Sequence, residues 1–227
     1  LLQRHKSDQW ATAHVKAQDN GLALAAGIIQ GTARAVNDGS FKTKKGTSAS
    51  ILYGSMSTKS SHILSVNQVP GRPKEQSAYR SKLAGVSGSL AIIECVCTIH
   101  DIQAGSITIG LDGDQALKAA AGQWPLHPGQ PEYDLLMDIR AKIQKLPITV
   151  HWQWIKGHQD DSVARENLDD WAMLNVYVDH MAKAYWNHTT AQGIYARPQE
   201  FSNEGWSLYL QGQKMSRLDK HEVYALC

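Results

Sequence analysis

The hydrophobic periodicity of this 227-residue chain changes near residue 70. Before that point, segments at 32–38, 46–54 and 62–69 have the composition of strands and are separated by polar turns. After it, an apolar stripe keeps helical spacing between residues 79 and 97. This order predicts an antiparallel meander of three strands packed against a long amphipathic helix.

The rest of the chain alternates between the two periodicities. Strand-like runs lie at 106–111 and 148–155, and helical stretches lie at 115–121, 136–146 and 171–185. The predicted order is therefore β-β-β-α-β-α-α-β-α. It indicates an α/β fold in which a five-stranded mixed sheet carries helices on its faces.

This pattern covers residues 32–191, which we predict to be one domain. Residues 1–31 show weak periodicity and are expected to be a lead-in segment. Residues 192–227 are expected to be a C-terminal extension with a strand pair at 206–210 and 213–216.

Composition excludes several classes of protein. Lys and Arg number 23 against 21 Asp and Glu, so the formal charge is +2 and no partner is selected by bulk charge. No run of about 18–20 consecutive apolar residues occurs, so no membrane segment is expected. The three cysteines predict neither a disulfide-linked partner nor a zinc site. The chain begins at Leu1 and is expected to be part of a longer, intracellular protein whose targeting signals are not readable here.

Three isolated acids stand at the ends of predicted elements: Asp38 at the first strand, Asp112 after the fourth, and Asp179 in the last helix. Carboxylates that converge at one edge of a sheet bind a hard divalent cation or acquire raised pKa values. Turn chemistry explains Asp38 or Asp112 equally well when each is considered alone.

Several segments together resemble the type 1 ribonuclease H domain, and more closely the version found downstream of reverse transcriptase in retroelements. The resemblance covers about residues 32–190 and rests on the strand leading into 38–40, the helical segment 77–85, the strand ending at Asp112, the stretch 154–160, and Leu174 and Asn175 before Asp179.

The resemblance implies a ribonuclease H-like fold and hydrolysis of the RNA strand of an RNA–DNA hybrid. It implies two Mg²⁺ ions, replaceable by Mn²⁺, held in part by Asp38, Asp112 and Asp179. It also implies a reverse transcriptase domain in the same polyprotein as a partner. His158 matches a mobile loop histidine that assists proton transfer, although a lone loop histidine is often merely exposed.

Lys82 departs from the family pattern, which has a glutamate there as its second catalytic acid. The exchange replaces a negative charge by a positive one and repels cations, so hydrolysis is expected to be impaired. Glu75 lies two helical turns away, about 10 Å, and is too distant to substitute. We prefer the hypothesis that the Lys82 ammonium occupies the space of a metal and pairs with Asp38 and Asp112. The alternative is a solvated surface lysine.

Substrate contacts are also expected from the resemblance and from local charge. The candidate residues are Gly39, Ser40, Ser77, Arg80 and Asn175. The segment from residue 42 to residue 82 contains eight basic residues and one acid, which gives a local charge of +7. Such a basic cluster could bind the phosphates of a hybrid. The alternatives are a solvated lysine-rich turn for this stretch and a structural hydrogen bond for Asn175.

Three functional classes remain open. The leading one is a ribonuclease H-like domain of a retroelement polyprotein with impaired hydrolysis. The second is a catalytically inactive module that binds nucleic acid or has a structural role. The third is another metal nuclease of the same superfold, such as an integrase. The Lys-Gly-His motif that ends at His158 and the pair Asn175 and Asp179 disfavour it.

Overall fold

The structure, a computed structural model, describes residues 8–55, 61–194, 201 and 207–224. Its elements are α1 (Gln9–Thr12), β1 (Val15–Ala17), α2 (Leu22–Gln30), β2 (Ala33–Lys42), β3 (Lys45–Tyr53), β4 (His62–Gln68), η3 (Pro73–Glu75), α3 (Ala78–Ile99), β5 (Ser106–Leu111), α4 (Asp114–Ala120), α5 (Tyr133–Lys145), β6 (Thr149–Trp154), η4 (Gln159–Asp161), η5 (Arg165–Asn167), α6 (Asp170–Ala191), β7 (Tyr209–Leu210), β8 (Gln213–Lys214) and α7 (Lys220–Tyr224). From β2 to α6 the strands and α-helices follow the predicted β-β-β-α-β-α-α-β-α order, which confirms the predicted α/β fold with a mixed sheet and helices on its faces.

One mixed sheet holds the strands in the order β1-β4-β3-β2-β5-β6. β2, β3 and β4 form the predicted antiparallel meander, while β5 runs parallel to β2 and β6 parallel to β5. The sheet has six strands rather than the predicted five, because β1 adds to the edge of β4. A strand of three residues is too short to produce a detectable period of two.

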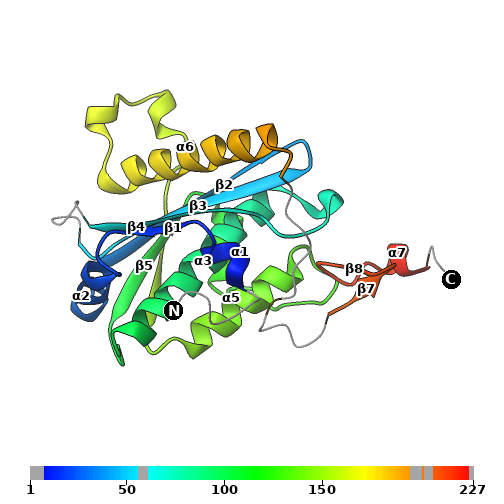
Figure 1. Cartoon of the computed structure of the whole chain (residues 1–227), viewed down its shortest axis with the longest axis horizontal. Helices are drawn as coiled ribbons and strands as arrows, with labels where there is room; N and C mark the ends of the chain where they lie inside the picture. Colours follow the sequence, from blue (N-terminus) through cyan, green and yellow to red (C-terminus); the bar gives the residue numbers. More distant parts are fainter. Residues whose placement is uncertain (1–7, 56–60, 195–200, 202–206, 225–227) are drawn as a thin grey trace.

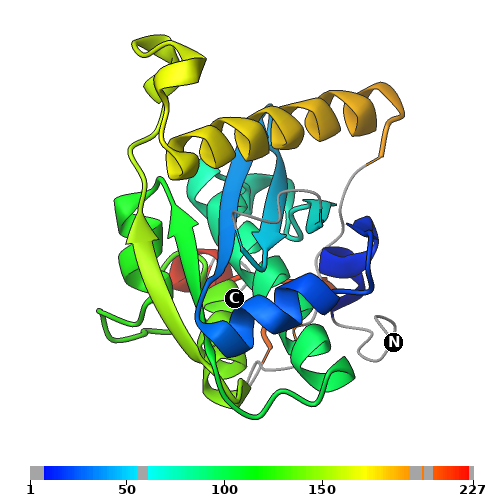
Figure 2. The ribbon, with the colours of Figure 1, turned by 90° about the vertical axis from the view of Figure 1, so that its left-hand side faces the viewer.

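Helices cover both faces of the sheet (Figure 1). α6 lies on one face, where Leu174 and Val178 pack with Val36 of β2. α3 and α5 lie on the other face, where Leu83 and Ile139 join the larger hydrophobic core. The view turned by 90° shows the same separation of α6 from α3 (Figure 2). The sheet is therefore buried from both sides over β2 and β3.

α3 is the central helix of the larger core. Its first turn is capped by Ser77, whose hydroxyl accepts a hydrogen bond from the Arg80 amide at 2.9 Å. By length and composition alone α3 is apolar enough to span a bilayer, but 72% of its apolar window is buried inside the domain. Such burial is typical of the core helix of a globular domain.

The described part of the predicted lead-in shares this core. Leu24 and Ile28 of α2 are buried in the larger cluster, and Asp8 forms an ion pair with Lys142 of α5 at 2.8 Å. The boundary predicted at residue 31 stays a prediction, but residues 8–30 pack with the domain that follows.

The C-terminal extension contains the expected strand pair. β7 and β8 are antiparallel, with Tyr209 opposite Lys214 and Leu210 opposite Gln213. The start of the predicted first strand, at Trp206, lies outside the described residues. The boundary predicted at residue 191 stays a prediction.

Candidate active site

Two of the three predicted acids meet where the parallel pairing of β2 with β5 ends. Asn37 of β2 is in register with Leu111 of β5, so the residues that follow, Asp38 and Asp112, lie side by side. Their side chains are 5% and 9% exposed, respectively. The carboxyl ends of parallel strands are a common place for ligand sites.

Lys82 of α3 reaches both carboxylates. Its Nζ atom donates to Asp38 Oδ1 at 2.5 Å and to Asp112 Oδ1, and its side chain is 19% exposed. The close approach of α3 to β2 brings the lysine here: a side chain at Gly39 would lie 2.7 Å from the Lys82 amide nitrogen. The predicted pairing of Lys82 with Asp38 and Asp112 is confirmed, and the alternative of a solvated lysine is wrong.

The charges of this cluster affect one another. Burial alone would lower the pKa of Lys82, but the negative charges of Asp38 and Asp112 raise it above its ordinary value. Burial raises the pKa of Asp38, and the charge of Asp112 raises it further, despite the opposing charge of Lys82. One ammonium therefore stays charged between two carboxylates and balances only one of them.

The third acid has a different partner. Asp179 of α6 forms an ion pair with Lys183, one turn later, at 2.6 Å. The hydrogen bond from Lys183 to Asp179 raises the pKa of this lysine, and the charges of Asp38 and Asp160 add to the shift. Lys183 was not among the predicted site residues, although its spacing of four from Asp179 on a helix is a signal that could have found it.

The loop after β6 closes one side of the site. A side chain at Gly157 would lie 2.9 Å from Asp112 Oδ2, so the loop backbone contacts this carboxylate directly. Trp154 donates from Nε1 to the Asp112 carbonyl at 3.2 Å. His158 follows in the same loop with a φ of 53° and is exposed. The sequence therefore placed His158 in the correct loop, and its role as a proton carrier stays a prediction.

Two predicted substrate residues at the end of β2 have contacts within the domain. The Gly39 amide donates to Asp38 Oδ1 at 2.7 Å, and the Ser40 carbonyl accepts from Ser81 Oγ at 3.4 Å. Gly39 is thus required for close packing of α3 and for fixing the Asp38 carboxylate. A contact of either residue with a ribose stays a prediction.

Arg80 does not reach the surface. Its side chain is fully buried, with Nη1 2.6 Å from Glu132 Oε2 and Nη2 2.8 Å from Asp134 Oδ2. Burial would lower the pKa of Arg80, but these acids raise it above the ordinary value, so the guanidinium stays charged. The predicted phosphate contact of Arg80 is therefore blocked in this conformation, because protein atoms surround the guanidinium on all sides. Ser77 also has a partner inside the domain, because its hydroxyl donates to Glu132 Oε1 at 3.2 Å.

Asn175 is a buried residue of α6 and is 3% exposed. Its Oδ1 atom has no hydrogen-bond partner among the described residues. The Oδ1 atom of Asn175 therefore does not make the local structural hydrogen bond that was the alternative for this residue. The contact of Asn175 with substrate stays a prediction.

Half of the basic stretch is neutralised within the described part of the chain: four of its eight basic residues pair with acids. Arg72 and Lys74 pair with Glu222 of α7, and Arg80 and Lys82 pair as described above. Lys45 is 5% exposed and donates to the Ile194 carbonyl at 2.8 Å. Of the other basic residues, Lys59 lies outside the described part of the chain. The +7 of the sequence is therefore not a continuous free positive surface.

The site does not fit the two divalent cations that the resemblance implies. The Lys82 ammonium contacts both Asp38 and Asp112, so it already engages carboxylate oxygens that a divalent cation would need as ligands. Over the residues that the structure describes, no group of three or more His, Cys, Asp or Glu side chains is arranged to hold a metal. The observed donor set is that of an ion-pair cluster.

Comparison with known proteins gives matches among solved structures alone. No protein-family model and no curated protein matches the chain. The N-terminal RNase H domain of a Mycobacterium tuberculosis protein, solved as a fusion with maltose-binding protein, is 12% identical with a TM-score of 0.48, covering 72% of this chain and 100% of that one. LC11-RNase H1, isolated from compost, is 9% identical with a TM-score of 0.46 over 70% and 99%. RNase H1 of Halobacterium salinarum is 12% identical with a TM-score of 0.38 over 58% and 90%.

Proposed function

We propose that this chain is a ribonuclease H-like domain of a retroelement polyprotein, related to enzymes that hydrolyse RNA in RNA–DNA hybrids, and that Lys82 impairs hydrolysis in this copy. The observation that carries the proposal is the ammonium of Lys82 between Asp38 and Asp112. A reverse transcriptase domain in the same polyprotein is the proposed partner.

The impairment follows from electrostatics. At about 4 Å and an effective dielectric constant of about 20, each pair of unit charges interacts by roughly 4 kcal/mol. The Lys82 ammonium would therefore repel a divalent cation strongly, while it already satisfies the carboxylates that would attract one. Asp38 and Asp112 lie together beside Lys82, and His158 is exposed in the loop after β6, which supports the proposal that the exchange at residue 82 is the departure that matters most.

The direct test is a cleavage assay with an RNA–DNA hybrid in Mg²⁺ or Mn²⁺, comparing the wild type with Lys82→Glu. We expect the variant to cleave at least about tenfold faster, which corresponds to about 1.4 kcal/mol of activation free energy. Lys16→Glu is the matched control, because it makes the same charge change on the exposed β1 edge at the other side of the sheet. Rapid cleavage by the wild type would contradict the impairment.

A second candidate function is a catalytically inactive module that binds nucleic acid or supports a neighbouring domain. The same Lys82 ion pairs favour it, because they hold the end of β5 and the start of α3 together without a metal. If neither the wild type nor Lys82→Glu cleaves a hybrid, and both bind it in a salt-sensitive way, this second function is the better explanation.

A further inference from the structure

The C-terminal segment 207–224 has a firmly packed part and a loosely packed part. Met215 is 2% exposed, and the Ser216 amide donates to Glu75 Oε1 at 2.9 Å. α7 follows directly, contains no buried residue, and ends with Tyr224 at 71% exposure. The segment is therefore anchored at residues 214–216, while α7 rests on the surface.

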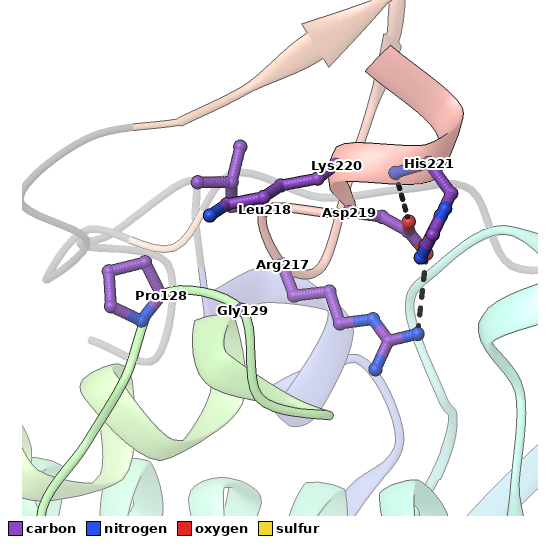
Figure 3. A pocket seen from close by; sticks show the side chains of 7 residues that line it. All are labelled: Pro128, Gly129, Arg217, Leu218, Asp219, Lys220 and His221. Carbon is purple, nitrogen blue, oxygen red and sulfur yellow. Dashed lines mark hydrogen bonds and ion pairs between the residues drawn. The ribbon is translucent and has the colours of Figure 1, made fainter. Parts of the chain in front are cut away.

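Hollows separate the region around α7 from the body of the domain. One of about 570 Å³ lies between residues 217–221 and the loop at Pro128 and Gly129 (Figure 3). Another of about 250 Å³ lies between the same region and residues 72–77. In Figure 3, Arg217 pairs with Asp219 inside the segment rather than with the body, at 3.3 Å. α7 thus lacks the dense apolar packing that holds the other helices.

Charge holds α7 in place. The Glu222 Oε2 atom lies 2.5 Å from Lys74 Nζ and 3.0 Å from Arg72 Nη1, so two cations converge on one oxygen. Lys74 is 55% exposed and Glu222 is 25% exposed. An oxygen of a phosphodiester has the charge and hydrogen-bonding capacity to replace this carboxylate oxygen. The Lys74–Glu222 pair is exposed and contributes little to stability, so a polyanion can compete for Lys74. The Arg72 side chain is 6% exposed and is also held by Glu75, whose Oε1 atom lies 2.5 Å from Arg72 Nη2, while Arg72 Nη1 reaches Glu222.

We propose that Arg72 and Lys74 form a binding site for the sugar-phosphate backbone of a nucleic acid, and that Glu222 of α7 occupies this site in its absence. The C-terminal segment is then an internal competitor that lowers nucleic-acid affinity. The identity of the ligand as an RNA–DNA hybrid rests on the proposed function, whereas the competition by Glu222 does not.

The test measures equilibrium binding of a fluorescently labelled RNA–DNA hybrid, and of duplex DNA of the same length, in EDTA so that no cleavage interferes. We expect Glu222→Gln to bind about threefold to tenfold more tightly than the wild type at about 50 mM salt, and the dependence of log K on log salt to steepen by about one. Tighter binding of both duplexes indicates backbone recognition, while a gain for the hybrid alone identifies the hybrid as the preferred ligand.

Two further variants keep the result interpretable. Asp101→Asn removes an equal charge from an exposed position beyond the other end of α3, and we expect it to change affinity less than twofold. Lys74→Gln added to Glu222→Gln should cancel the gain, because it removes the exposed cation that pairs with Glu222. A Glu222→Gln affinity equal to that of the wild type or of Asp101→Asn, or a gain that survives Lys74→Gln, would overturn the proposal. Hybrid cleavage by Lys82→Glu is a separate readout, so the proposed function and this inference can fail independently.

Discussion

Two lysines of this domain each hold a pair of aspartates, in different surroundings. Lys142 of α5 is completely buried and lies 2.6 Å from Asp138 Oδ2 and 2.8 Å from Asp8 Oδ1. It also donates to Ser87 Oγ of α3 at 3.1 Å. This cluster connects three helices, and all its donors point at protein atoms.

Lys82 has similar partners at a different place in the fold. It holds Asp38 and Asp112 where the parallel pairing of β2 with β5 ends, and its side chain is 19% exposed, whereas that of Lys142 is 0% exposed. The comparison teaches that an ammonium between two carboxylates indicates no function by itself. Location distinguishes a core ion pair from one that fills a potential ligand site.

The largest expected effect is the loss of the buried cluster. Lys142→Met should lower the free energy of unfolding by about 3–5 kcal/mol, because it removes the buried cation that pairs with both Asp8 and Asp138. Urea denaturation monitored by circular dichroism measures this. Lys118→Met, which breaks the exposed pair with Asp114, is the control and should cost less than about 1 kcal/mol. If both variants lost a similar free energy of unfolding, burial would not explain a difference between the Lys142 and Lys118 ion pairs.

Lys82→Met should destabilise the domain less, by about 1–3 kcal/mol near pH 8, because its site is partly solvated. The loss should shrink on acidification. Without the ammonium, burial and the charge of Asp112 hold the pKa of Asp38 further above the 3.8 of the unfolded chain. A raised folded-state pKa means that stability falls as pH rises from about 3.8 through the folded-state pKa. Denaturation at pH 5 and pH 8 should give a smaller difference from the wild type at pH 5; an equal difference would argue that Lys82 does not balance Asp38.

The order of strands and helices was predictable from local periodicity. The pairing of Lys82 with Asp38 and Asp112, 44 and 30 residues away, was expected because the family resemblance assigns the three positions to one site. Ala78, Gly85 and Ser89 share a helical stripe with Lys82 and are small, which is consistent with the close approach of α3 to the sheet. The neutralised basic stretch was not predictable in this way. The carboxylates that pair with Arg80 are 52 and 54 residues away, and Glu222, which pairs with Arg72 in addition to the nearby Glu75, is 150 residues away. Glu132 also lies at a left-handed position after an irregular loop, which no periodicity indicates.

Added Mg²⁺ should distinguish the Lys82 site from the Lys142 cluster by a smaller change in stability. We expect no rise in the melting temperature of the wild type, since the Lys82 ammonium repels the ion and takes its ligands. In Lys82→Glu, Mg²⁺ at ten times its dissociation constant should stabilise by about 1.4 kcal/mol. Ca²⁺ in parallel tests whether any divalent ion suffices. Equal stabilisation of the wild type would contradict the conclusion that its donor set does not fit the metal.

The smallest effect is expected at the second lysine of the site. Lys183 is 56% exposed, and its pair with Asp179 lies along one helix face at a spacing of four. Such a pair contributes about 0.3–0.5 kcal/mol, so Lys183→Gln should change the free energy of unfolding by no more than that. If Lys183 also repels cations from Asp179, the double variant Lys82→Glu with Lys183→Gln should bind Mg²⁺ more tightly than Lys82→Glu alone. Titration calorimetry measures this difference, and equal affinities would restrict the electrostatic block to Lys82.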